Sequence, residues 1–171
     1  MVLSPISNTA VTVGADGYVR VWDYGNKVQF YSQNFATRSE ATAIEWIPYS
    51  KKNGGRMLAV GFSDGLLRFV ILNQSSIELV KVFKIHRRKI THIKSSPDGV
   101  TLAVIDESGD IFLCSLNSSK IQDIAPYCLY ETGFKVNDVC WDRDSTKILL
   151  GCKDGNLAEI KVLRPQQCDN S

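Results

Sequence analysis

The feature that most constrains the fold of this chain is a short pattern that occurs four times along it. Its clearest copy runs from Thr9 to Asp23, where two β-type runs flank the pair Asp16-Gly17. Asp and Gly tolerate the positive φ angles of tight hairpin turns, so such a pair between alternating hydrophobic residues predicts a β-hairpin. The pair or a close variant returns as Asp64-Gly65, Ser108-Gly109 and Asp154-Gly155.

The spacing of these pairs identifies the repeated unit. From Gly17 to Gly65 is 48 residues, to Gly109 a further 44 and to Gly155 a further 46. A period of about 40–50 residues is typical of β-propeller blades, each of which is a sheet of four short strands. A second marker, a β-type run that precedes a hairpin, returns in the same phase at 42–48, 90–97 and 136–143. Two markers in one phase therefore predict a repeated four-stranded sheet.

The strands of each unit, named a to d in chain order, can be assigned from these runs, and the second marker is strand a. Strand b is expected at 9–13, 57–61, 101–105 and 146–151. Strand c is expected at 18–22, 66–72, 110–116 and 156–162. Strand d is expected at 27–31, at 77–84 and within 120–130. Pro126 should limit the last of these strands because proline cannot donate a hydrogen bond to a neighbouring strand.

The hairpin that ends in Trp22-Asp23 resembles the inner hairpin of a WD-repeat β-propeller blade, and the resemblance covers roughly residues 8 to 163. It implies an all-β fold, a partial WD-repeat β-propeller with about three and a half blades of four-stranded antiparallel sheet. The first blade is expected to lack strand a and the last blade strand d, which leaves about fourteen strands. Residues 1–163 would form this propeller segment with its four b-c hairpins, and residues 164–171 a polar C-terminal tail. The remainder of a longer propeller, or a partner, would be needed to close the ring.

The resemblance also implies a structural role for several polar residues. In the family, an Asp of the b-to-c turn, a Ser or Thr of strand b, a His before strand a and the Trp of strand c form a hydrogen-bonded tetrad. Thr12, Asp16 and Trp22 match three of these positions, and no blade matches all four. The other tetrad-like residues are Asp64, His86 and Asp154. Because a buried carboxylate needs hydrogen-bond partners, these residues are expected to hold hairpins in shape rather than to catalyse.

The chain lacks the usual sequence signals of an enzyme, a cofactor or a metal site. It has no Gly-rich phosphate loop, no H-E-x-x-H pair and no G-x-S-x-G elbow. His86 and His92 are six residues apart, a spacing that suits neither a helical nor a strand pair of metal ligands. Cys114, Cys140 and Cys152 fall in expected strands, where free cysteine behaves as a small buried hydrophobe, whereas a metal or disulfide role would want closer spacing. No catalytic residue, cofactor or metal is therefore expected.

Composition and charge favour an intracellular protein without a membrane partner. The chain is 44% hydrophobic and 22% charged with a net charge of +2, and residues 1–10 do not resemble a secretory signal. The one charge feature is the loop at 84–89, whose candidate partner-binding residues are His86, Arg87, Arg88 and Lys89. It would lie on a d-to-a loop at a propeller rim, either as a contact for an acidic partner or as a solvated loop. Nucleic acid is not the expected partner, because a heavy basic excess and interleaved aromatic residues are missing.

A narrower resemblance bears on function. The run GADGYVRVWD, followed by blades that keep Asp-Gly but lose the Trp, resembles the large axonemal WD-repeat proteins of cilia and flagella. This implies a non-enzymatic scaffold for protein–protein interaction in the cytoskeleton of the cilium or flagellum. Such a scaffold would tether or regulate dynein on microtubule doublets, with tubulin or dynein-associated axonemal subunits as partners. The alternative is a substrate-recognition or assembly propeller of a ubiquitin ligase or of an RNA-processing complex.

Overall fold

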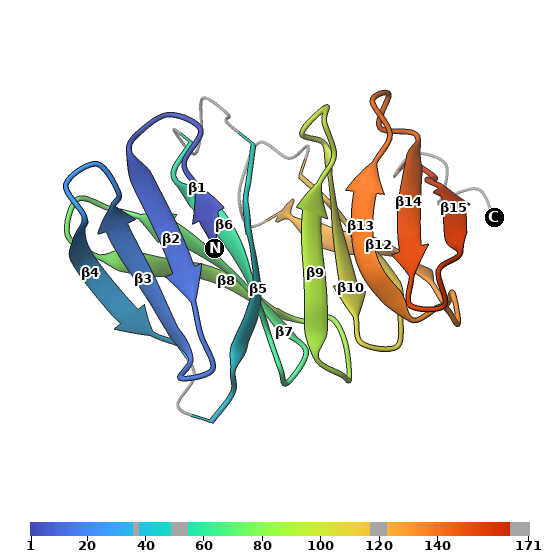
Figure 1. Ribbon diagram of the computed structural model, residues 1–171, viewed down its shortest axis with the longest axis horizontal. Helices are drawn as coiled ribbons and strands as arrows, with labels where there is room; N and C mark the ends of the chain where they lie inside the picture. Colours follow the sequence, from blue (N-terminus) through green and yellow to red (C-terminus); the bar gives the residue numbers. More distant parts are fainter. Residues whose placement is uncertain (36–37, 49–54, 117–122, 165–171) are drawn as a thin grey trace. The chain divides into compact units, whose positions relative to one another are not determined.

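The computed structural model describes residues 1–35, 38–48, 55–116 and 123–164. It divides into two compact units, unit 1 with residues 1–90 and unit 2 with residues 91–171. The described residues form fifteen β-strands in four antiparallel sheets (Figure 1). Within this part of the chain, no helix has the length and apolar character that a membrane crossing requires. The all-β class and the repeated antiparallel sheets expected for a partial propeller are confirmed.

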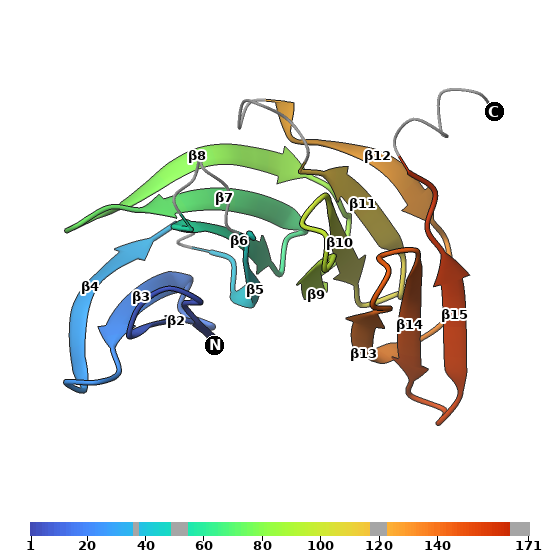
Figure 2. The same cartoon turned by 90° about the horizontal axis from the view of Figure 1, so that it is seen from above.

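Unit 1 holds two four-stranded sheets in which strands consecutive in the chain are neighbours. Sheet 1 consists of β1 (Val2–Leu3), β2 (Thr9–Val13), β3 (Tyr18–Asp23) and β4 (Val28–Asn34). Sheet 2 consists of β5 (Ala41–Trp46), β6 (Met57–Phe62), β7 (Leu66–Leu72) and β8 (Ile77–Lys84), which lie side by side in that order in Figure 2. Each sheet is therefore a simple meander with its turns at its two ends.

Unit 2 repeats this arrangement. Sheet 3 consists of β9 (Ile90–Ser95, which begins at the last residue of unit 1), β10 (Thr101–Asp106), β11 (Ile111–Ser115) and β12 (Ala125–Tyr130). Sheet 4 consists of β13 (Val136–Trp141), β14 (Lys147–Cys152) and β15 (Leu157–Lys161). Residues 165–171, most of the expected polar tail, lie outside the described residues.

Two details of the strands differ from the expectation or refine it. The prediction that the first blade lacks strand a is wrong, because β1 pairs with β2 through Val2–Val11 and Leu3–Ala10. A two-residue strand is too short to show an alternating pattern in the sequence. Pro126 lies at the start of β12, at the edge of its sheet, where the pairing with β11 shifts register between Leu113 and Cys114. An edge strand with an irregularity is where a sheet accommodates proline.

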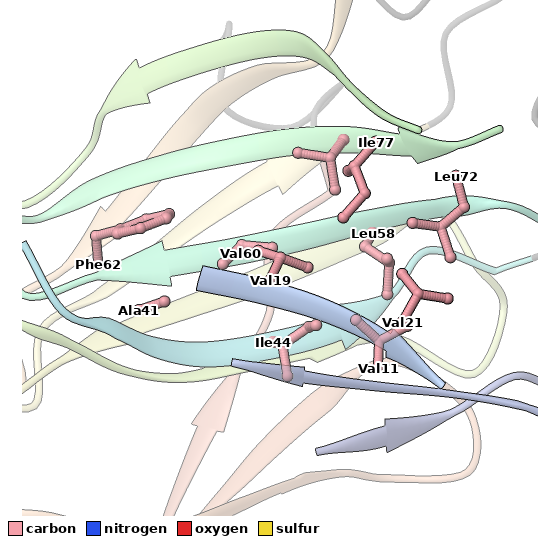
Figure 3. Close-up of a cluster of buried hydrophobic side chains, with 11 residues drawn as sticks. Val11, Val19, Val21, Ala41, Ile44, Leu58, Val60, Phe62, Leu72 and Ile77 are labelled. Atoms are coloured by element: carbon pink, nitrogen blue, oxygen red, sulfur yellow. The ribbon is translucent and has the colours of Figure 1, made fainter. Parts of the chain in front are cut away.

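The core of unit 1 lies between its two sheets. Alternate residues of β2 and β3, namely Val11, Val19 and Val21, pack against sheet 2 (Figure 3). Sheet 2 contributes Ala41, Ile44, Leu58, Val60, Phe62, Val70, Leu72 and Ile77. Unit 2 has an equivalent core between sheets 3 and 4, built from Ala103, Ile105, Ile111, Leu113, Val136, Val139, Ile148, Leu150, Cys152 and Val162. Burial of these hydrophobic side chains is the main stabilising term for each pair of sheets.

Candidate functional site

The Asp-Gly pairs fold their own turns. The carboxylate Oδ1 atoms of Asp16, Asp64 and Asp154 accept hydrogen bonds from the backbone N–H two residues later, at 3.1, 3.0 and 3.1 Å. The glycines that follow them, Gly17, Gly65 and Gly155, have φ angles of 75, 79 and 86°. An Asp side chain that caps the turn and a glycine that accepts positive φ explain why this pair recurs at three of the four b-to-c connections.

The tetrad-like residues of sheet 1 form two separate contacts. The indole Nε1 of Trp22 donates to Thr12 Oγ1 at 2.9 Å. Asp16 instead accepts from Arg20, with the Arg20 Nη1 to Asp16 Oδ1 distance at 3.2 Å. The hydrogen bond from Arg20, followed by that from the Tyr18 backbone, lowers the pKa of Asp16 below its ordinary value. The structure therefore brings Thr12 and Trp22 together, while Asp16 pairs with an arginine that the sequence analysis did not single out.

His86 lies on the connection between β8 and β9 and packs against the Asp64-Gly65 turn of sheet 2. Only 4% of it is exposed, and its backbone N–H donates to the Gly65 carbonyl at 3.2 Å. A Cβ atom on Gly65 would collide with the His86 carbonyl, so the glycine is required for this close approach. The loop that carries the basic residues is therefore fixed against the Asp64-Gly65 turn.

In sheet 3 the sequence analysis missed the residue that organises the turn. Ser108 stands where the other turns have Asp, but the buried carboxylate of Asp106 accepts from the backbone N–H groups of Ser108 and Asp110 at 2.9 and 3.2 Å. The Thr132 hydroxyl donates to the Gly109 carbonyl at 2.8 Å. An Asp two residues before the expected position, at the end of a strand, was the available signal.

The four candidate partner-binding residues have different surroundings. His86 is buried, and the Lys89 ammonium lies 3.2 Å from Glu40 Oε2 in an ion pair. Arg87 and Arg88 are exposed and form no ion pair with the acidic residues in the described part of the chain. The surface cations of this loop that remain available for a partner are thus Arg87 and Arg88.

Hydrogen bonds also join the connections that surround this basic loop to one another. We call residues 14–17, 38–40, 63–65 and 85–89 of unit 1 the turn rim. Within it, Glu40 N–H donates to Ser63 Oγ at 3.0 Å and Asp64 N–H to Ser39 Oγ at 3.2 Å. Lys84 Nζ donates to the Asp64 carbonyl. Hydrogen bonds between residues that are distant in the sequence therefore hold the turn rim together.

The remaining histidine and the cysteines lie in ordinary structural surroundings. His92 on β9 has its ring nitrogens within 3.0 Å of Thr91 Oγ1 and 3.2 Å of the Asn137 carbonyl, and burial lowers its pKa. Cys114 is buried, and desolvation raises its pKa to about 12. The expectation of burial is wrong for Cys140, which is exposed because it alternates with the inward-facing Val139. In the ranges that the structure describes, no cluster of potential metal ligands occurs.

Comparisons with known proteins give several relatives at low identity, and no family model matches the chain. The chain is 23% identical over 177 residues to cilia- and flagella-associated protein 44 of Mus musculus, covering 93% of this chain and 9% of that protein. It is 31% identical over 110 residues to WD repeat-containing protein 90 of the same organism, covering 64% of this chain and 6% of that protein. It is 25% identical over 159 residues to the 77 kDa echinoderm microtubule-associated protein of Strongylocentrotus purpuratus, covering 92% of this chain and 22% of that protein. The chain thus spans less than a quarter of the length of each of these relatives.

Proposed function

We propose that this chain, a segment of a WD-repeat β-propeller, acts as a non-enzymatic interaction scaffold in the axoneme of cilia and flagella. The repeated antiparallel sheets and the relatives named for WD repeats support the family. The relatives named for cilia, flagella and microtubules support the location. Within that setting, we propose that the scaffold tethers or regulates dynein on the microtubule doublets.

The observation that carries this proposal is the turn rim of unit 1. Its connections are tied to one another and to the Asp64-Gly65 turn, so they present Arg87 and Arg88 from a fixed surface. Loops held on a rigid sheet scaffold are the usual place for recognition of protein partners. A scaffold needs such a surface and no reacting groups.

The partner that this surface fits is acidic. Two adjacent guanidinium groups form bidentate hydrogen bonds with carboxylates, and the strength of such contacts falls as salt screens them. Acidic tails of tubulin in the doublet have this chemistry. Lys89 and His86 would act indirectly, since one is paired with Glu40 and the other is buried under the loop.

The proposal also gives bounds for the propeller segment within this chain. Residues 1–163 would be the propeller segment and residues 164–171 a polar tail. Sheets 1 and 4 would meet the remainder of a longer propeller or a partner, since propeller blades bury their faces against neighbours.

The proposal is tested first by co-sedimentation of the chain with microtubules at several salt concentrations. We expect binding that weakens with salt, and a loss of about tenfold in affinity when Arg87 and Arg88 are both replaced by Ala. Lys161→Ala with Lys153→Ala, which removes two surface charges of unit 2, is the matched control and should bind like the wild type. Microtubules whose acidic tails have been removed by subtilisin should bind the wild type as weakly as the double variant.

The axonemal role is tested by proximity labelling with the tagged chain in ciliated cells. Recovery of tubulin and dynein subunits is the expected result, and their loss with the Arg87→Ala, Arg88→Ala variant would assign the contact to the turn rim. Recovery of ubiquitin-ligase or RNA-processing subunits without axonemal proteins would overturn the axonemal role.

A further inference from the structure

Unit 1 contains a cavity at the end of its sheets opposite the turn rim. Its volume is about 230 Å³, and it lies among the β1–β2 connection, β3 and β4 of sheet 1 and the ends of β5 and β7 in sheet 2. The apolar side chains that line it are Ile6, Val21, Phe30, Tyr31, Trp46 and Leu72. Ile6 and Phe30 are 54% and 55% exposed, whereas Val21 and Leu72 are buried. The cavity thus has an apolar mouth that leads to the core of unit 1.

The polar part of the lining carries one charge. Arg56 is exposed and is the charged residue among the described lining residues, which include no carboxylate. The other polar side chains there are Ser4, Ser7, Thr9, Asn73 and Gln74. An occupant therefore meets an apolar surface beside a cation.

The same place in unit 2 can be identified by counting from the b-to-c turns. Ile6 lies ten residues before Asp16, and Asp98 lies ten residues before Ser108. The equivalence is supported by a shared hydrogen bond, because Ser4 N–H donates to Thr9 O and Ser96 N–H to Thr101 O, both at 2.8 Å. By the same counting, Gln74 corresponds to Arg164 and Gly55 to Ser145.

In unit 2 these equivalent residues tie the two sheets together. Arg164 Nη1 lies 3.1 Å from Asp98 Oδ2 in an ion pair. The Asp98 N–H donates to Ser145 Oγ at 3.1 Å. The Tyr127 hydroxyl, from the residue that corresponds to Phe30 in the strand register, donates to the Leu163 carbonyl at 3.3 Å. Polar side chains therefore close this end of unit 2.

Two of these ties have no counterpart in unit 1, because Ile6, Gln74 and Gly55 stand at the equivalent positions. The third is replaced by a hydrogen bond from the neighbouring residue on β4, since the Tyr31 hydroxyl donates to the carbonyl of Asn73, the equivalent of Leu163, at 2.6 Å. A further difference concerns the two tryptophans at the ends of β5 and β13. Trp141 Nε1 donates to the Lys94 carbonyl at 3.1 Å, whereas the buried Trp46 Nε1 has no acceptor within the described residues. Unit 1 thus lacks the ion pair and the Ser145 hydrogen bond that close this end of unit 2, and the exposed side chain of Ile6 stands in place of Asp98.

We propose that this cavity binds one large apolar side chain of an acidic peptide segment from a partner protein. At about 230 Å³ the cavity is smaller than the roughly 300–1,000 Å³ of small-molecule sites, and it suits a single anchor residue of a protein interface. Arg56 at the mouth favours carboxylates beside that anchor, because an exposed guanidinium pairs with them directly. This site is separate from the turn rim and does not depend on the axonemal proposal.

The test measures fluorescence polarisation of a fluorescein-labelled peptide, Glu-Glu-Phe-Glu-Glu, added to the chain. We expect binding that falls at least about tenfold when Ile6→Asp and Gln74→Arg are combined, since this pair installs the ion pair of unit 2 across the mouth. Asp98→Asn with Arg164→Gln removes that ion pair from unit 2 and should leave peptide binding unchanged. The peptide is therefore also measured in the Arg87→Ala, Arg88→Ala background, which removes the acidic-partner contact of the turn rim. Binding that persists in this background and falls when Ile6→Asp and Gln74→Arg are added belongs to the cavity, so a failure here and a failure of the turn rim are distinguishable.

A second variant addresses charge without altering the cavity. Arg56→Glu, at an exposed position, should reverse the preference, so that a Lys-Lys-Phe-Lys-Lys peptide binds more tightly than the acidic one. Circular dichroism and thermal melts confirm that each variant is folded. Equal binding of the two peptides by the wild type, or undiminished binding by the closed variant, would overturn the proposal.

Discussion

Equivalent faces of the two sheets of unit 1 have different surroundings. Counting from the b-to-c turn, Thr12 and Trp22 of sheet 1 correspond to Val60 and Val70 of sheet 2. In sheet 2 this face packs against sheet 1, and both valines are fully buried. In sheet 1 it lies opposite the face that packs on sheet 2, and a hydrogen bond joins Trp22 to Thr12. The signature tryptophan is thus kept where a polar partner is at hand, and a valine replaces it where a sheet covers the position.

Arg20 and Arg68, each four residues after the Asp of its b-to-c turn, show how the surroundings of this face affect a charged side chain. Arg20 of sheet 1 forms an ion pair with the turn carboxylate of Asp16. Arg68 of sheet 2 is only 9% exposed, and its guanidinium carbon lies 4.0 Å from the centroid of the Phe62 ring. Its Nη1 atom has no hydrogen-bond partner in the part of the chain that is described. Desolvation correspondingly lowers the pKa of Arg68. One sequence pattern therefore yields a solvated ion pair in one sheet and a desolvated cation over an aromatic ring in the next.

The largest effect is expected from a substitution that gives the buried face of sheet 2 the residue found at the equivalent position of sheet 1. Leu58 is fully buried in sheet 2, and the equivalent residue of sheet 1 is Ala10. Leu58→Ala should lower the free energy of unfolding by about 2–5 kcal/mol, because it removes buried methyl groups and leaves a cavity. Urea denaturation followed by circular dichroism measures the change. Leu79→Ala, at an exposed position of β8, is the control and should cost less than about 1 kcal/mol. Similar costs for the two variants would show that sheet 1 does not cover sheet 2 in solution.

The hairpins of both sheets were predictable from sequence because their signals are local. An Asp-Gly pair fixes its turn within four residues, and alternation fixes the strands on either side, so 66–72 was predicted to the residue. The faces of the strands in contact with another sheet were not predictable in this way. Cys140 and the buried Arg68 show this, since their surroundings depend on which sheet lies opposite. The division of the basic loop into a buried His86 and an exposed Arg88 likewise depends on packing against a turn distant in sequence.

A smaller effect, of opposite sign in the two sheets, is expected from removing each arginine. Arg68→Met should raise the free energy of unfolding by about 1 kcal/mol. The substitution removes a desolvated charge and its unsatisfied N–H group and puts an apolar side chain of similar length in their place. Arg20→Met should lower the free energy of unfolding only slightly, because the ion pair that it removes is exposed. Thermal melts measure both changes, with about 2–4 °C expected per kcal/mol for a chain of this size. A destabilising Arg68→Met would mean that its contact with Phe62 outweighs the cost of desolvation.

The smallest effect concerns the turn of sheet 1 and depends on pH. The hydrogen bond from Arg20 lowers the pKa of Asp16 below its ordinary value of 3.8, so folding favours the ionised carboxylate. The stabilisation is present above the unfolded-state pKa of about 4 and is lost as the pH falls through the lowered folded-state pKa. Asp16→Asn cannot ionise, so the melting temperature of the wild type should exceed that of the variant at pH 7, and the gap should narrow below about pH 4. Arg20→Met should narrow the gap in the same way, because it removes the main cause of the shift. A gap that stays constant from pH 7 to pH 2 would show that the Asp16–Arg20 contact does not persist in solution.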